Sequence, residues 1–247
     1  MAPSTLVMAH RGLAGYAPEN TRAAYTAALA LRFGIEVDLT PTADGEIVML
    51  HDHRLDRTTS GSGPAAEHSA AEIQALDAGS WFHPVYADQR VPTLAEMLAL
   101  VGGLVAPSTI VALDLKAVPD ALLARIVDAV RGADLVGHVV AIGTTISSEE
   151  VRCQLKALEP ALATARLVES DAAWDATMAD PLSDWVYIRH VPTAERVAAA
   201  HAAGKRVIKA GPLANGIEPV AWRALAAAGV DVILSDYPVE CRLAIGR

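Results

Sequence analysis

Three short stretches near the beginning of the chain place titratable side chains at the ends of apolar runs that indicate buried strands. These stretches are Met8-Ala-His-Arg-Gly12, Ile35-Glu-Val-Asp-Leu-Thr40 and Met49-Leu-His-Asp52. A strand buried only for packing would carry Val, Ile or Leu at these positions, because a buried polar group costs free energy unless it is paired. The titratable residues of these stretches are therefore the first candidates for chemistry.

Carboxylates at a spacing of two residues indicate a binding site for a hard metal ion. Glu36 and Asp38 have this spacing, and Asp114 and Lys116 repeat it on a later apolar run. Because strand side chains alternate between two faces, each pair shares one face of its strand. Three carboxylates brought together repel one another unless a cation lies among them, and oxygen ligands without Cys or paired His suit Mg²⁺ or Ca²⁺. We expect a divalent metal here; the alternative is a set of structural ion pairs.

His10 and His51 are candidates for proton transfer. Each follows an apolar run, so both are expected at the same edge of the sheet as the carboxylates. Two imidazoles that titrate near neutral pH can donate one proton and accept another, which the cleavage of a phosphoester at pH 7 requires. Either histidine alone would more often be structural. The nearby carboxylates and Arg11 favour the functional interpretation.

The order of segments along the chain indicates how these residues come together. Apolar runs alternate with amphipathic ones, which is typical of repeated βα units. Eight units in 247 residues fit an α/β fold of the (β/α)₈ TIM-barrel type better than an open doubly wound sheet, and no Gly-x-Gly-x-x-Gly follows the first strand. The carboxyl ends of barrel strands meet at one mouth, where the site would lie. We expect the strands at residues 6–10, 35–40, 110–116, 139–143, 163–168, 185–190, 206–210 and 230–235.

The chain departs from regular alternation after the second strand. Asp44-Gly45 predicts a turn, so residues 46–50 are expected to return as an antiparallel arm. Residues 54–91 contain many Gly, Ser and Pro and have helical periodicity only at 70–76, which predicts an insertion over one face of the barrel. Asn20 is a plausible N-cap for a helix at 21–33. Further helices are expected at 93–100, 120–130, 148–158, 172–178, 193–203 and 219–228.

Composition excludes some classes of function. The net charge of −9 argues against a nucleic-acid-binding protein, because binding a phosphate backbone needs a basic surface. We expect no signal peptide and no membrane-spanning run, and hence one cytoplasmic domain over residues 1–247. Cys153 and Cys241 lie far apart without metal-ligand or redox spacing, so we expect ordinary thiols. The oligomeric state is open.

Several of these motifs, taken in order, resemble the glycerophosphodiester phosphodiesterase family. The resemblance runs from residue 8 to about 95, returns near the C-terminus and covers the middle only thinly. The matching segments are His10-Arg-Gly12, Pro18-Glu-Asn-Thr21, Glu36-x-Asp38, Asp44-Gly45, His51-Asp52, Leu55-Asp-Arg-Thr-Thr59, Leu76-Asp-Ala-Gly79, Pro92-Thr-Leu94 and Ser235-Asp-Tyr-Pro238.

The resemblance implies a fold and an activity. The fold is a distorted TIM barrel of the phospholipase-C-like phosphodiesterase type, with a small inserted region that covers the substrate. The activity, part of lipid and glycerol metabolism, is hydrolysis of glycerophosphodiesters to sn-glycerol 3-phosphate and an alcohol, with Mg²⁺ or Ca²⁺, or alternatively Mn²⁺. The implied site consists of metal ligands Glu36, Asp38 and Asp114, an acid–base pair His10 and His51 whose order of action is open, and phosphate-binding Arg11 and Lys116.

Three further residues are expected to play supporting roles, and the chain departs from the family pattern at two places. Glu19 is expected to brace Arg11 or the surroundings of the metal ligands, and Asp52 is expected to support the site. Asp236 is expected to cap or orient the last βα loop. The first departure is Asp114, where the family usually has Glu. The second is the stretch 207–212, which carries Lys209 where a Trp-containing run is common; Lys209 is expected to bind an extra anionic group of the substrate or to pair with a carboxylate.

Three alternatives to this activity are open. A lysophospholipid or another phosphodiester could be the substrate, although aromatic residues make up only 4% of the chain and no aromatic rim is expected. Lys116 or Lys209 on an inward strand face could instead serve a Schiff-base aldolase. A catalytically silent relative would only bind a phosphodiester. We favour small, deacylated headgroup diesters as substrates.

Overall fold

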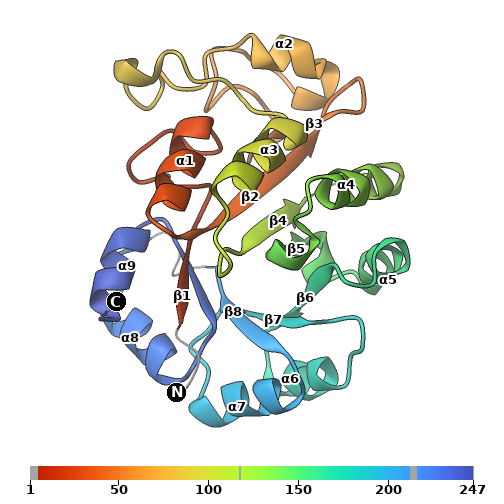
Figure 1. The fold of residues 1–247 in the computed structure, drawn as a ribbon, viewed down its shortest axis with the longest axis vertical. Coiled ribbons are helices and arrows are strands. Elements are labelled where there is room, and N and C mark those ends of the chain that lie inside the picture. The colour runs from red at the N-terminus through yellow and green to blue at the C-terminus, as the bar shows by residue number, and fades with distance from the viewer. Residues whose placement is uncertain (1–4, 117, 212–215, 247) are drawn as a thin grey trace.

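The computed structural model describes residues 5–116, 118–211 and 216–246, and Pro212 of the stretch discussed above lies outside them. Within the described residues, eight parallel strands close into a barrel, because β1 pairs with both β9 and β2. The predicted TIM barrel is thus confirmed (Figure 1). The eight strands are β1 (Leu6–Ala9), β2 (Gly34–Pro41), β4 (Val111–Leu115), β5 (Val139–Gly143), β6 (Ala163–Val168), β7 (Trp185–Ile188), β8 (Arg206–Lys209) and β9 (Val232–Ser235).

Helices surround the strands, as Figure 1 shows. Most of them begin at a Ser or Thr whose hydroxyl accepts a hydrogen bond from a backbone N–H of the first turn, which satisfies a group that the helix itself leaves unpaired. The helices of this layer are α1 (Arg22–Ala30), α3 (Leu94–Leu104), α4 (Asp120–Gly132), α5 (Glu149–Leu158), α6 (Asp171–Met178), α7 (Ala194–Ala202), α8 (Pro219–Ala227) and α9 (Pro238–Ala244).

The predicted N-cap of the first helix is wrong by one residue. Thr21 caps α1 by accepting a hydrogen bond from the backbone N–H of Ala24. Asn20 instead adopts a φ of +56° and turns its side chain toward the barrel, where its amide donates to Asp38 at 2.8 Å. A charge-assisted hydrogen bond to a buried carboxylate is stronger than a cap bond, which explains the exchange of roles.

The predicted hairpin arm and insertion are both present. β3 (Ile47–Met49) pairs antiparallel with β2. The insertion contains α2 (Ala70–Gln74) and two 3₁₀ turns, η1 (Ala65–Glu67) and η2 (Pro84–Tyr86), and projects beyond α1 and α3 at the top of Figure 1. It packs against the barrel edge through a small apolar core of its own, formed by Val48, Leu50, Leu55, Ala65, Ala70, Ile73, Ala78 and Val91.

Strand alternation divides the core into two layers. Residues such as Ile142, Tyr187 and Ile208 fill the barrel interior, whereas Ile188 and Ile233 belong to the larger core that includes the surrounding helices. Lys209 lies opposite Ile188 and Ile233 in the sheet register and therefore shares their outward face. The expectation of an inward Lys209 is wrong.

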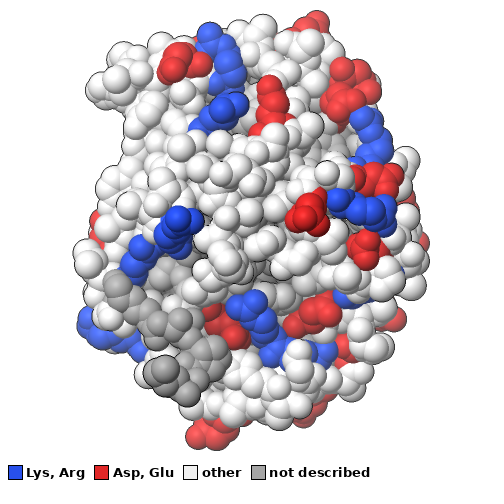
Figure 2. Space-filling view, viewed as in Figure 1, with Lys and Arg blue, Asp and Glu red and all other residues white. Residues whose placement is uncertain are grey.

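The surface carries mixed charges. On the face drawn in Figure 2, groups of Lys and Arg side chains lie among Asp and Glu side chains. Among the described residues, none of the helices combines the length and the apolar character that crossing a bilayer requires.

Candidate active site

Three carboxylates meet at the carboxyl end of the barrel. Asp38 and Asp114 lie directly opposite each other on β2 and β4, and Glu36 stands one inward position earlier on β2. One oxygen from each of the three carboxylates can be chosen so that all lie within 4.8 Å of one another. Two ligands on opposite sides of a Mg²⁺ or Ca²⁺ ion are about 4–5 Å apart, so this spacing fits a single ion.

The electrostatics of these carboxylates also fit a cation. Burial, together with Asp38 and Asp114 nearby, raises the pKa of Glu36 to about 8. Burial and the charge of Asp38 raise the pKa of Asp114 to about 6. The Oδ1 atom of Asp114 is buried without a hydrogen-bond donor. A divalent ion held by Glu36, Asp38 and Asp114 would supply the missing positive charge and satisfy this oxygen.

Gly143 makes room for the shorter Asp114 side chain. A Cβ atom at this position would lie 2.1 Å from the Asp114 Oδ1 atom, which no structure tolerates, and the φ of Gly143 is +74°. The carboxylate therefore occupies the place of a side chain on the neighbouring strand β5. Despite the exchange of Glu for Asp at this position, the three carboxylates converge.

Two cations hold the carboxylates from either side. The Lys116 ammonium lies 2.8 Å from Asp38 Oδ1 and also donates to the carbonyl of His51 at 3.0 Å. The Arg11 Nε atom lies 3.5 Å from Asp38 Oδ2, and the Arg11 backbone N–H donates to Glu36. Although burial opposes it, the charge and hydrogen bond of Lys116 and the amide of Asn20 hold the pKa of Asp38 below its usual value.

Each histidine is oriented by a carboxylate. Asp236 lies 2.5 Å from Nδ1 of His10, and Asp52 lies 2.6 Å from Nδ1 of His51. The other nitrogen of His10, Nε2, faces the carboxylates at 3.9 Å from Glu36. Burial lowers the pKa of His10, but the hydrogen bond that the ring donates to Asp236 and the charge of Glu36 outweigh it and raise the pKa overall. At His51 burial dominates and lowers the pKa.

Asp236 does not cap the helix after the last strand, so this part of its predicted role is wrong. The first residue before α9 is Tyr237, and no side chain caps that helix. Asp236 instead reaches across the closure of the barrel, because β9 and β1 are neighbours and bring it beside His10.

Sequence reasoning missed one residue that joins the supporting carboxylates. Glu19 accepts a hydrogen bond from Arg11 at 3.0 Å, as expected. Arg57 then donates to both Glu19 and Asp52 with four bonds of 2.7–3.0 Å, and so links the insertion to both histidine loops. The Leu55-Asp-Arg-Thr-Thr59 motif contained this residue, but Glu19, the partner that completes the link, is 38 residues away in the sequence.

Two cavities flank the carboxylates. One, of about 290 Å³, lies beside His10 and is bounded by Trp81 and Phe82 of the insertion and by Tyr237. The expectation that the mouth lacks aromatic side chains is therefore wrong on this side. The other, of about 460 Å³, lies beside Asp114 and is lined by polar and apolar residues of β4, β5 and β7 and the loops after them.

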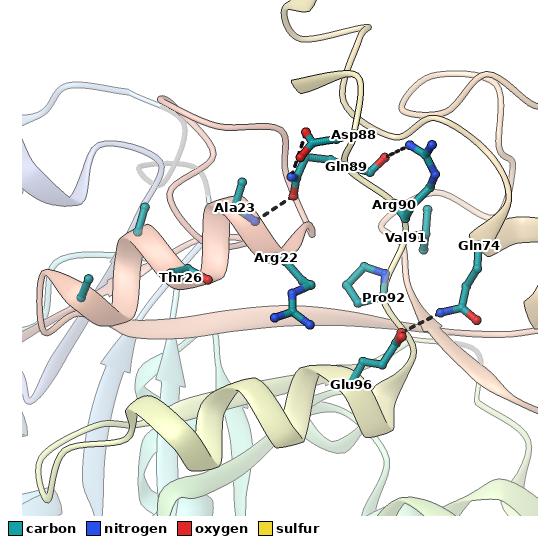
Figure 3. Close-up of a pocket in the computed structure, with 12 residues that line it drawn as sticks. Arg22, Ala23, Thr26, Gln74, Asp88, Gln89, Arg90, Val91, Pro92 and Glu96 are labelled. Atoms are coloured by element: carbon teal, nitrogen blue, oxygen red, sulfur yellow. Dashed lines mark hydrogen bonds between the residues drawn. The ribbon is translucent and has the colours of Figure 1, made fainter. Parts of the chain in front are cut away.

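A third cavity, of about 720 Å³, lies away from the carboxylates. It is formed by α1, the start of α3 and the end of the insertion, as Figure 3 shows. Gln89 accepts a hydrogen bond from the backbone N–H of Ala23 across it, and Gln74 donates to Glu96. This cavity marks where the insertion docks on the outer side of the barrel.

Comparisons with known proteins agree with this geometry. The chain is 44% identical over 106 residues to a glycerophosphodiester phosphodiesterase of Bacillus subtilis, an alignment that covers 39% of this chain and 36% of the relative. It is 46% identical over 99 residues to the enzyme of the same name from Caldanaerobacter subterraneus, which covers 40% of this chain and 41% of the relative. The aligned part thus spans about two fifths of the length of the curated relatives.

Solved structures match over nearly the whole chain. A glycerophosphodiester phosphodiesterase from Agrobacterium tumefaciens superposes with a TM-score of 0.80 and 28% identity, and covers 97% of this chain and 99% of its own. A phosphodiesterase from Oleispira antarctica in complex with the product sn-glycerol-3-phosphate has a TM-score of 0.80 and 27% identity, over 99% of this chain and 98% of its own. The family model described as the glycerophosphoryl diester phosphodiesterase family matches residues 10–240. With this match across the barrel and its site, the chain belongs to the glycerophosphoryl diester phosphodiesterase family.

Proposed function

We propose that this protein hydrolyses glycerophosphodiesters to sn-glycerol 3-phosphate and an alcohol, and that it requires a divalent metal. The observation that carries the proposal is the joint position of three carboxylates and two histidines at one mouth, each histidine oriented through Nδ1 by a carboxylate. Family membership and the Oleispira structure with sn-glycerol-3-phosphate support this choice of reaction.

The substrate phosphate would be held by positive charge. Arg11 and Lys116 flank Asp38 and can each donate to a phosphate oxygen, which offsets charge that builds in the transition state. A divalent metal held by Glu36, Asp38 and Asp114 would act as a Lewis acid on the same phosphate. Together with Arg11 and Lys116, such an ion would offset the charge of the three carboxylates, so that the phosphate enters a site without excess negative charge.

The two histidines would move the protons. With Nδ1 bound to a carboxylate, each ring has Nε2 free to act at the phosphate. One imidazole accepts the proton of the glycerol 2-hydroxyl as this oxygen attacks phosphorus, and the other protonates the departing alkoxide. The products are an alcohol and a cyclic phosphate, which water opens with the two proton transfers reversed. Both orders of His10 and His51 satisfy this scheme.

The aldolase alternative has little support. A Schiff-base lysine must be neutral to act as a nucleophile, but Lys116 is ion-paired with Asp38 at 2.8 Å. Lys209 lies on the outward face of β8. We infer that the substrates are small diesters. The two groups esterified to the phosphate would each occupy one of the two flanking cavities.

The proposal is tested by incubating the protein and a divalent metal with glycerophosphocholine and glycerophosphoethanolamine and measuring released sn-glycerol 3-phosphate. His10→Gln and His51→Gln should each lower kcat at least 100-fold, because a positioned acid or base contributes about 10²–10⁴-fold. The matched control is His138→Gln, since His138 precedes β5 at the opposite end of the barrel. Full activity in both site variants would contradict the proposal.

A further inference from the structure

Arg189 is a cation at the mouth of the barrel that is unpaired within residues 5–116, 118–211 and 216–246. It follows directly after β7 and is exposed. Among the described residues, it forms no hydrogen bond, and no carboxylate lies within ion-pair distance of it. By contrast, Arg11 and Lys116 in the same mouth are both bound to Asp38. As far as the described part of the chain shows, the guanidinium of Arg189 is therefore available to a ligand.

Arg189 shares a cavity with one of the proposed metal ligands, Asp114. It lines the 460 Å³ cavity together with Asp114, Lys116, Tyr187 and Ser147. Burial raises the pKa of the Tyr187 hydroxyl, Glu36 and Asp114 raise it further, and Arg189 lowers it. The Tyr187 hydroxyl thus lies close enough to both the carboxylates and the guanidinium to interact electrostatically with each. A group bound at Arg189 would lie in the same cavity as Asp114 and Lys116.

The surrounding backbone gives the Arg189 side chain a fixed path. A Cβ atom on Gly211 would lie 2.8 Å from Cγ of Arg189, and the φ of Gly211 is +84°. The Arg189 side chain therefore packs over a backbone position that suits glycine and would be strained with any other residue. Behind it, the buried ammonium of Lys209 donates to the carbonyl of Ala210, and among the described residues it has no carboxylate within ion-pair distance. Two cations thus lie near each other here, and within the described residues neither is ion-paired with a carboxylate.

We propose that Arg189 forms a second anion-binding subsite, which selects glycerophosphodiesters whose alcohol carries an additional carboxylate or phosphate group. The inference rests on the proposed function and specifies its substrate class. Arginine suits this role because its planar fork binds carboxylate and phosphate through two parallel hydrogen bonds. The long-range charge of Lys209 behind it favours the same ligands.

Two matched pairs of substrates isolate the additional anion. Glycerophosphoserine differs from glycerophosphoethanolamine by one carboxylate, and glycerophosphoglycerol phosphate differs from glycerophosphoglycerol by one phosphate. For each pair, the ratio of kcat/KM values is measured with metal-loaded protein. We expect the anionic member to be favoured at least tenfold in one or both pairs, because a charge-assisted contact contributes about that much. The pair with the larger ratio identifies the anion.

Variants test whether Arg189 causes the preference. Arg189→Gln should bring the ratio close to one, and Arg189→Lys should retain part of it, because the charge remains but the fork is lost. The control is Arg22→Gln, since Arg22 is exposed on α1 at the outer cavity in Figure 3; its ratio should equal that of the unmodified protein. A ratio of one in the unmodified protein, or an undiminished ratio in Arg189→Gln, would overturn the inference. Release of no sn-glycerol 3-phosphate from any of the four diesters would instead overturn the proposed function, and the inference with it.

Discussion

The buried carboxyl of Glu36 leads to a prediction about stability. Burial and the neighbouring carboxylates raise its pKa to about 8 in the metal-free protein, against an ordinary value of 4.5. Between these pH values the folded chain holds a proton that the unfolded chain has released, so the free energy of unfolding falls as pH rises. One pKa unit corresponds to about 1.4 kcal/mol, so the loss from Glu36 reaches about 4 kcal/mol at pH 8.

Glu36→Gln removes this titration and nearly preserves the shape of the side chain. We expect the free energy of unfolding of the variant, relative to the unmodified protein, to rise by about 4 kcal/mol from pH 4.5 to pH 8. Any cost of the substitution that is independent of pH cancels in this comparison. The assay is urea unfolding in EDTA at four pH values between 4.5 and 8.

A saturating divalent metal provides the control for this experiment. The ion replaces the proton in the unmodified protein and should remove most of the loss of stability above pH 6, because binding to the folded state stabilises it. The variant lacks one ligand and should gain much less from the same metal concentration. A difference between the two proteins that is constant from pH 4.5 to 8, or an equal stabilisation of both by metal, would refute the reasoning.

Three further predictions concern residues around the site. Gly143→Ala should weaken metal binding at least tenfold in calorimetric titration, because the new Cβ displaces the Asp114 carboxylate; unchanged affinity would contradict this role. Asp236→Asn should lower the pKa of His10 in metal-free NMR titrations, since the hydrogen bond that raises this pKa loses its charge, and an unshifted titration would show that Asp236 does not act on the ring. Arg57→Ala should accelerate proteolysis within residues 54–91 at temperatures where the barrel stays folded, because Arg57 ties the insertion to the barrel; a cleavage rate equal to that of the unmodified protein would be inconsistent with this tie.

Much of the fold could be predicted because burial leaves a regular pattern in the sequence. Parallel strands with both faces covered appear as short apolar runs, so their number and order follow from the alternation with amphipathic helices. The end of the barrel that carries the site could also be predicted, because Glu36, Asp38, Asp114 and Lys116 interrupt apolar runs near their carboxyl ends. Because side chains alternate along a strand, the spacing of two residues within each pair placed these four side chains on the inner face.

The remaining features depend on contacts that the local pattern does not contain. Asp236 and His10 are 226 residues apart and meet only because the barrel closes between β9 and β1. Asn20 looked like a cap, but a buried carboxylate 18 residues away competes for its amide. The face of Lys209 depends on the register of β8, which a strand of four residues does not reveal.

The most direct test of the account is the metal dependence of sn-glycerol 3-phosphate release. The protein is first treated with EDTA, and Mg²⁺, Ca²⁺ or Mn²⁺ is then added back, with Asp114→Asn as the site variant and Asp175→Asn on the exposed side of α6 as the control. We expect no release in EDTA, and recovery with at least one of the three ions in the unmodified protein and in Asp175→Asn. Asp114→Asn should respond to the metal at least tenfold more weakly. Release that persists in EDTA, or that Asp114→Asn leaves unchanged, would contradict the central claim that these carboxylates hold the ion on which hydrolysis depends.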